Sequence, residues 1–165
     1  MQAKQFKLFV LFVLSFYSAI SSALEVGATV PNCHLKKMAD GSDLNLQATG
    51  KVLYVDFWAS WCGPCAQSLP FLEAINEEFK NKNFEVIAVN LDEVREDADA
   101  FLKQHPVKLT TAVNADGQCP GVFGVQAMPS SYIIDRKGKV RHIQLGFNLS
   151  EKAELKQKIE KILAE

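Results

Sequence analysis

Two cysteines separated by a glycine and a proline, Cys62-Gly63-Pro64-Cys65, are the residues of this chain best suited to chemistry. A disulfide between them would stabilise a fold little, because the entropic gain from a disulfide grows with the length of the loop it closes. A zinc site needs about four ligands, and the sequence offers no second Cys-x-x-Cys pair and no nearby pair of histidines. The spacing therefore favours reversible exchange, in which Cys62 attacks a partner disulfide and Cys65 resolves the mixed disulfide.

A strand and a helix must position these cysteines. The apolar run 51–59 is rich in β-branched and aromatic residues, which predicts a strand buried on both faces. Over residues 62–81, apolar side chains recur every three or four positions, which predicts a helix with one core face and a kink at Pro70. Unpaired N–H groups at the start of that helix would stabilise a Cys62 thiolate, while Cys65 would lie one turn further in and be more buried.

The rest of the chain alternates strand-like and helix-like patterns. We expect an N-terminal hairpin at 34–38 and 43–46, a second buried strand at 84–92, a helix at 93–104, a short strand at 109–113, a helical turn at 118–123, a hairpin at 131–135 and 140–146, and a last helix with Leu155, Ile159 and Ile162 on one face. This order predicts an α/β fold, with a sheet covered by helices on both faces. Residues 24–165 should form a single domain.

The first 23 residues predict export. Lys4 and Lys7 precede an apolar run that starts at Leu8, and small residues end at Ala23, which is the order of a secretory signal peptide with cleavage after that alanine. The apolar stretch falls slightly short of the ~20 residues that span a bilayer as a helix. The sequence fits both a signal peptide that is cleaved and one that is retained as a membrane anchor. The net charge of −1 gives no reason to expect a nucleic-acid partner.

Export would affect whether the four cysteines form disulfides. Disulfides persist outside the cytoplasm, so Cys33, Cys62, Cys65 and Cys119 are better interpreted as two pairs than as four buried thiols. Four cysteines allow three pairings, and the residues alone leave the choice among them open.

The segment VDFWASWCGPCAQSLP resembles the thioredoxin superfamily, through Asp56, Trp58, Trp61, both cysteines and Pro70. The resemblance covers roughly residues 50–165 and implies the thioredoxin fold, an α/β fold with a central mixed sheet. It also implies a cis-proline at Met128-Pro129, where the family docks substrate peptide beside the cysteines. Without the resemblance, an X-Pro bond would be expected to be trans.

The connection between Asp92 and Pro129 is much longer than in thioredoxin and has room for an inserted helix and strand. Together with the export signal and the N-terminal hairpin, it resembles the TlpA-like and ResA-like branch. Members of that branch are exported thiol-disulfide oxidoreductases, often tethered to the cytoplasmic membrane. The same branch includes proteins with a second, structural disulfide, which implies a bond between Cys33 and Cys119. In the chain-entropy model this bond would contribute on the order of 4 kcal/mol. Free thiols and a second redox pair that relays electrons are the alternatives.

The resemblance also implies roles for residues around the cysteines. Asp56 stands where thioredoxin has a buried acid, and burial would raise the pKa of Asp56 toward neutrality so that it could accept the Cys65 proton. The alternative is a hydrogen-bonded strand-end aspartate without a catalytic role. Ala88 replaces the lysine that partners this acid in thioredoxin, and Ser68 replaces an active-site glutamate of ResA-like reductases. We expect Trp58 to pack in the core, and we expect substrate contacts from Trp61, Gly63, Pro64, Met128 and Pro129.

The combined prediction is a periplasmic thiol-disulfide oxidoreductase that reduces disulfides in exported proteins. We expect a monomer that receives electrons from a membrane donor and has no metal or cofactor. His105 and His142 show no ligand spacing, and His34 beside Cys33, the alternative metal ligand, is isolated and more typical of a surface residue. Gly-Pro between the cysteines resembles reducing thioredoxin, whereas oxidising DsbA-type proteins have Pro-His. Apo-cytochrome c, and with it cytochrome c biogenesis, fits the family as a substrate, as do copper-oxidase assembly factors and misoxidised proteins in general.

Other functions use the same scaffold or the same cysteine pair. A thiol oxidase or isomerase would differ mainly in its reduction potential. A thiol peroxidase is disfavoured because the Pro-x-x-x-Thr-x-x-Cys setting is missing around Cys62. A non-catalytic copper-binding assembly factor would need a further ligand facing the thiols, and the sequence does not place one.

Overall fold

The computed structural model describes residues 24–47 and 49–165, and its strands are β1 (Leu35–Lys37), β2 (Asp43–Leu44), β3 (Val52–Trp58), β4 (Phe84–Asn90), β5 (Thr110–Asn114), β6 (Ser130–Ile134) and β7 (Val140–Leu145). They form one seven-stranded sheet in the order β2-β1-β5-β4-β3-β6-β7. The neighbours β3, β4 and β5 run parallel, and the remaining pairs are antiparallel. The predicted signal or anchor, residues 1–23, lies outside the described residues. Within the described ones, no helix has the length and apolar character needed to cross a membrane.

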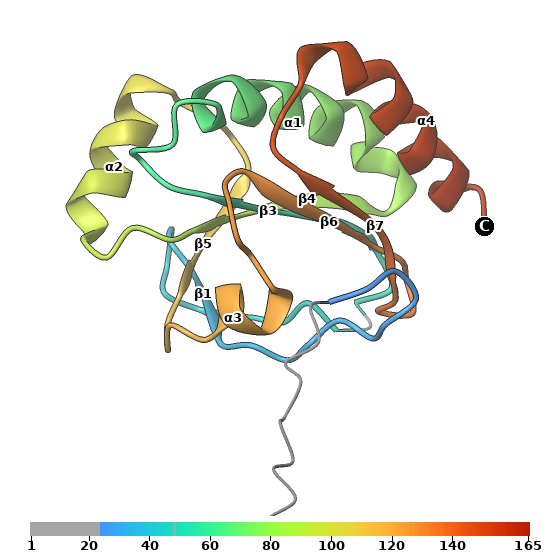
Figure 1. Cartoon of the computed structure of the whole chain (residues 1–165), viewed down its shortest axis with the longest axis horizontal. Coiled ribbons are helices and arrows are strands. Elements are labelled where there is room, and N and C mark those ends of the chain that lie inside the picture. The colour runs from blue at the N-terminus through green and yellow to red at the C-terminus, as the bar shows by residue number, and fades with distance from the viewer. Residues whose placement is uncertain (1–23, 48) are drawn as a thin grey trace, which may run out of the picture.

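Helices cover both faces of this sheet, as expected, but unequally (Figure 1). The long helices α1 (Cys65–Phe79), α2 (Arg95–Gln104) and α4 (Lys152–Leu163) pack on one face. The short helix α3 (Cys119–Phe123) and the N-terminal segment cover the other. Two separate apolar cores result, one on each side of the sheet. The short 3₁₀ turns η1 (Lys80–Lys82) and η2 (Leu149–Glu151) follow α1 and precede α4.

The central strand β3 explains where the reactive residues lie. Every residue of β3 is buried, which confirms the strand predicted from its unbroken apolar run. Because side chains alternate across a strand, Tyr54 and Trp58 enter the core beneath α1, and Phe57 enters the core beneath α3. Asp56 shares the face of Tyr54 and Trp58. A carboxyl group is thereby placed on the side of the sheet that carries the cysteine pair.

The insertion and the N-terminal hairpin widen the sheet. The predicted helix and strand between β4 and β6 are present as α2 and β5, and β5 extends the sheet parallel to β4. The predicted hairpin forms between β1 and β2, and β1 also pairs with β5, which the sequence did not predict. The Met128-Pro129 peptide is cis, as the resemblance implied.

Helix α2 begins at Arg95, two residues later than expected, and short turns precede α1 and α4. The helix expected from residue 62 begins at Cys65, because residues 59–64 form a turn and Pro64, which lacks an N–H, occupies the N-cap position. Before α4, Asn148 caps the short turn η2 by accepting a hydrogen bond from the Ser150 N–H. In both places a tight turn precedes the regular helix, and the spacing of apolar residues in the sequence does not distinguish such a turn from the first turn of a helix.

Candidate active site

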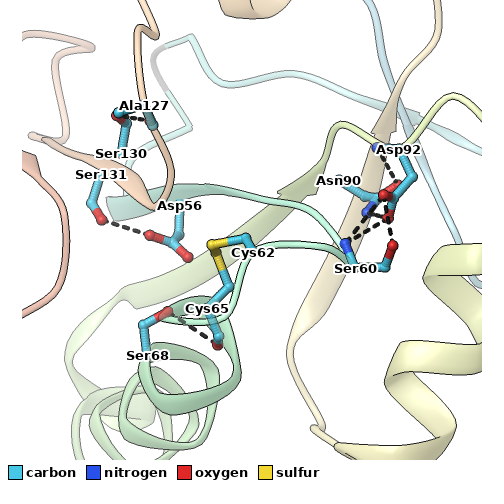
Figure 2. The surroundings of a disulfide bond; sticks show 10 residues. All are labelled: Asp56, Ser60, Cys62, Cys65, Ser68, Asn90, Asp92, Ala127, Ser130 and Ser131. Carbon is cyan, nitrogen blue, oxygen red and sulfur yellow. Dashed lines mark hydrogen bonds between the residues drawn. A yellow bond between two sulfur atoms is a disulfide. The ribbon is translucent and has the colours of Figure 1, made fainter.

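The Cys62–Cys65 pair forms a disulfide at the point where β3 passes into α1 (Figure 2). Its Cα atoms lie 5.3 Å apart. Cys62 retains 4% of its surface exposed, whereas Cys65 has none. The exposure order is the predicted one, although Cys62 is itself nearly covered. An attacking sulfur from another protein therefore reaches the bond at Cys62.

The turn that holds Cys62 is fixed by backbone hydrogen bonds. The Cys62 N–H donates to the Ala59 carbonyl at 3.1 Å, and the Cys65 N–H donates to the Cys62 carbonyl at 3.0 Å. Gly63 and Pro64 are exposed, and a side chain at Gly63 would meet open space. Helix α1 is described throughout and has no acidic residue in its first turn. No side chain of that turn therefore opposes the N-terminal dipole where negative charge would develop on Cys62.

A carboxylate from the neighbouring strand anchors the loop just before Cys62. Both oxygens of Asp92 accept from the Ser60 N–H, at 3.1 and 2.9 Å, and the Ser60 hydroxyl donates to the same carboxylate at 2.9 Å. The Asn90 side-chain amide donates to Asp92 at 2.7 Å (Figure 2). This network was not predicted from the sequence. Its signal was the polar pair Asn90 and Asp92 at the end of an otherwise apolar strand.

The proposed substrate contacts gather around the same disulfide. Trp61 is 71% exposed, which suits the contact surface expected of it, and Trp58 is fully buried against Phe101, which confirms core packing. Met128 packs against the apolar core that includes both cysteines. The Pro129 carbonyl accepts from the Gly146 N–H at 2.7 Å, which ties the cis-proline loop to the end of β7. The roles of these residues toward a substrate stay predictions.

Asp56 lies fully buried between β6 and the disulfide (Figure 2). Its Oδ1 accepts from the Ser131 hydroxyl at 2.6 Å, and its Oδ2 has no hydrogen-bond partner among the described residues. Burial raises the pKa of Asp56 to about 7, against a smaller lowering by the Ser131 hydrogen bond. The geometry thus provides a base at neutral pH beside Cys65, with one oxygen available for a proton.

The departures from thioredoxin and ResA-like proteins fall inside this site. Ala88 is the register partner of Asp56 on β4, so an apolar methyl group occupies the position of the thioredoxin lysine. Ser68 is buried, and its hydroxyl donates to the Cys65 carbonyl at 3.3 Å. Ser131 was not singled out from the sequence. Its signal was a serine in a strand whose residues are all buried.

The second disulfide joins Cys33 to Cys119, as the resemblance implied, and its Cα atoms lie 5.2 Å apart. It ties the N-terminal segment to the start of α3. Behind it, Phe57, Phe123 and Tyr132 pack edge to face with centroids 4.9–5.8 Å apart, and the Tyr132 hydroxyl donates to the Phe123 carbonyl at 2.8 Å. The bond therefore holds α3 against the sheet.

The three histidines make their contacts with residues other than Cys62 and Cys65. His34 pairs with Asp43 at 3.1 Å, His105 stacks on Phe101, and His142 is half-buried on β7. Residues 24–47 and 49–165 contain no group of three or more His, Cys, Asp or Glu side chains arranged to hold a metal ion. The absence of a metal or cofactor stays a prediction.

Comparison with known proteins agrees with this geometry. The family model described as Redoxin matches residues 25–159. The chain is 30% identical over 125 residues to the thiol-disulfide oxidoreductase ResA of Bacillus cereus, covering 75% of this chain and 72% of that protein. It is 30% identical over 152 residues to the thioredoxin-like protein YneN of Bacillus subtilis, covering 87% and 84%. A crystal structure from Chlorobium tepidum, described as that of a thiol:disulfide interchange protein DsbE, superimposes with a TM-score of 0.80 at 42% identity, covering 86% of this chain and 99% of that one.

Proposed function

The chain belongs to the Redoxin family and is a ResA-like thiol-disulfide oxidoreductase of the thioredoxin superfamily, and we propose that it is exported and reduces disulfides in other exported proteins. One observation carries the chemistry. A disulfide reachable at Cys62 lies at the start of α1, and the buried Asp56 beside Cys65 has one oxygen to which no described residue donates a hydrogen bond.

Two features support export. The first 23 residues have the order of a signal peptide. Cys33 and Cys119 form a second disulfide, and disulfides persist in oxidising compartments but are rare in the cytosol. The proposed location is therefore the periplasm, with the N-terminal segment either removed or retained as a membrane tether.

Reduction of a partner would proceed in two exchanges. The Cys62 thiolate attacks one sulfur of the partner disulfide, so that a Cys62–partner bond forms and the partner's own bond breaks. The departing partner sulfur leaves as a thiolate and takes a proton from water. Cys65 then gives its proton to Asp56 and attacks the Cys62 sulfur, which forms the Cys62–Cys65 disulfide and releases the second partner thiolate. The partner has gained two electrons, and the enzyme has lost two.

Another dithiol must return those electrons. We propose a membrane-bound dithiol protein as the donor, since an exported enzyme is separated from the reductants of the cytosol. The enzyme would act as a monomer. Substrates in this reading are exported proteins that carry an unwanted disulfide, including apo-cytochrome c during cytochrome c biogenesis and assembly factors of copper oxidases.

The reduction potential tests the direction of the reaction. Equilibration of the Cys62–Cys65 pair with glutathione should give a potential near the thioredoxin value of about −270 mV. A potential near the DsbA value of about −120 mV would overturn the reductase proposal in favour of an oxidase. Stoichiometric copper retained after purification, without insulin reduction, would instead favour the copper-binding alternative.

Trapping tests the class of partner. A Cys65→Ala variant, expressed with its N-terminal segment, should accumulate mixed disulfides between Cys62 and exported proteins, because the resolving sulfur is missing. The matched Cys62→Ala/Cys65→Ala variant should capture none. If the single variant captures no exported protein under conditions in which it is itself exported, the proposed substrate class is wrong.

A further inference from the structure

Among the described residues, Ser131 is the one side chain that donates a hydrogen bond to the buried acid and so fixes how its carboxylate points. The antiparallel register of β3 and β6 places Ser131 directly opposite Asp56. Ser131 is 5% exposed, and its hydroxyl lies 2.6 Å from Asp56 Oδ1, which is short for an O–H···O bond and typical of a charged acceptor.

In the part of the chain that the structure describes, no cation helps Ser131 to hold the Asp56 carboxylate. Its register partner on β4 is Ala88, and the α4 residues in the same core are apolar. On α1, the Ser68 hydroxyl is committed to the Cys65 carbonyl. On β3, the other titratable group is Tyr54, whose pKa is raised by burial and then by the nearby Asp56 charge, against a smaller lowering by its side-chain contact with Ser131. Its phenol therefore stays neutral. Within the described residues, Ser131 is thus the single hydrogen-bond donor to the carboxylate.

The hydrogen bond leaves the two carboxylate oxygens inequivalent. A serine hydroxyl has one proton, and here that proton is directed at Oδ1. Figure 2 shows the Asp56 carboxylate between Ser131 on one side and the cysteine pair on the other. Oδ2, which has no partner among the described residues, is therefore the oxygen left to receive a proton.

We propose that Ser131 is a positioning residue for the resolving exchange: it holds Asp56 Oδ1 so that Oδ2 faces Cys65 and takes the thiol proton. The inference rests on dithiol-disulfide exchange by Cys62 and Cys65 and holds for either physiological direction. In the step concerned, the Cys65 S–H bond breaks, its proton moves to Oδ2, and the Cys65 sulfur displaces the partner sulfur from Cys62. Ser131 neither gains nor loses a proton.

Removing the Ser131 hydroxyl should change the pKa of Asp56, and the direction follows from the charge of the carboxylate. A donor to a carboxylate favours its ionised form, so the Ser131→Ala change should move the pKa of Asp56 further upward. Asp56 acts as a base only when ionised. The pH at which the resolving exchange reaches half its maximal rate should therefore rise, by roughly one unit, which is about tenfold in rate at a fixed pH below that midpoint.

The test separates the two exchanges in one experiment. The protein, reduced at Cys62–Cys65 with the Cys33–Cys119 bond kept intact, is mixed with Ellman's reagent in a stopped-flow instrument across pH 5.5 to 9. The first release of thionitrobenzoate reports attack by Cys62, and the second reports displacement by Cys65. Ser131→Ala should slow the second phase and shift its pH midpoint upward without altering the first. Ser131→Thr, which keeps the hydroxyl, should restore the original midpoint.

Three further variants keep the outcome interpretable. Asp56→Asn should slow the second phase, and adding Ser131→Ala to it should cause no further change, because the two residues act through one proton transfer. Ser130→Ala, which removes a buried hydroxyl bonded to the Ala127 carbonyl, should leave the midpoint in place. An unchanged midpoint in Ser131→Ala, or additive losses in the double variant, would overturn the proposal. Absence of the first phase in the unsubstituted protein would instead refute the exchange chemistry itself.

Discussion

The molecule contains two disulfides with nearly the same Cα separation, 5.3 Å for Cys62–Cys65 and 5.2 Å for Cys33–Cys119, but with opposite surroundings. The first joins residues 3 apart, and the second joins residues 86 apart. The first begins a helix on one face of the sheet and lies beside a buried acid. The second fastens a short helix to the other face, over packed aromatic rings.

This contrast indicates different roles for the two disulfides, one in stability and one in thiol-disulfide exchange. Loop entropy grows with the length enclosed, so the long loop contributes stability and the short ring contributes little. Exchange requires a reachable sulfur and a group that takes the resolving thiol's proton, and Cys62–Cys65 has both. Within the described residues, no acidic side chain is hydrogen-bonded to Cys33 or Cys119. The Cys119 N–H donates to the neutral side-chain amide of Asn114.

Replacing Cys62 by serine should have the largest effect on activity. Without the attacking sulfur, insulin reduction should fall to the background rate. The free energy of unfolding should change little, because the short ring constrains the unfolded chain weakly. Insulin turbidity and urea unfolding measure the two quantities. Residual turnover above that of a protein lacking both Cys62 and Cys65 would show that another thiol attacks the substrate.

Replacing both Cys33 and Cys119 by serine should produce the opposite pattern. We expect the free energy of unfolding to fall by about 4 kcal/mol, since a loop of this length is released in the unfolded state. Insulin reduction measured well below the lowered melting temperature should persist. If turnover disappears while circular dichroism shows a folded protein, the second pair takes part in electron relay.

Asp56 should affect stability in a pH-dependent way. Its pKa is near 7 in the folded protein and 3.8 ordinarily, so the folded protein keeps a proton that the unfolded chain releases. Its contribution to stability is full below about pH 4 and is lost as the pH rises through 7. Asp56→Asn should therefore stabilise the protein by up to about 4 kcal/mol at pH 8 and hardly at all at pH 4. Equal stabilisation at both pH values would contradict the raised pKa.

The loop anchor should have the smallest effect. Asp92→Ala removes the acceptor for the Ser60 N–H and hydroxyl, which should cost about 1–3 kcal/mol and expose the Ser60 amide to solvent. Hydrogen exchange at residues 59–61 should accelerate, whereas exchange at α3 beside the second disulfide should not. Unchanged protection at Ser60 would show that the turn holds without Asp92.

The sequence predicted those features that depend on local pattern. The buried strands β3 and β4 appeared as unbroken apolar runs, and the cysteine spacing identified the reactive pair. Resemblance to a family contributed the cis-proline and the Cys33–Cys119 pairing, neither of which follows from composition or periodicity. Burial of Asp56 followed from its place in an apolar strand.

The missed features depend on register between distant strands. Ser131 reaches Asp56 because β3 and β6 pair antiparallel across 75 positions, and Asp92 reaches Ser60 because β3 and β4 run parallel with Trp58 opposite Asn90. The residue pattern of a single strand does not determine its register with another strand. The same limit explains why pairing of β1 with β5 was not predicted.

The central claim is that Cys62 is the nucleophile and Cys65 the shielded resolving thiol. Alkylation of the reduced protein with iodoacetamide at pH 7, followed by mass spectrometry of each cysteine, tests it directly. We predict fast modification of Cys62, well above the rate in the urea-unfolded chain, with Cys65 spared. Modification of Cys65 first, or of Cys62 no faster than in the unfolded chain, would contradict this account.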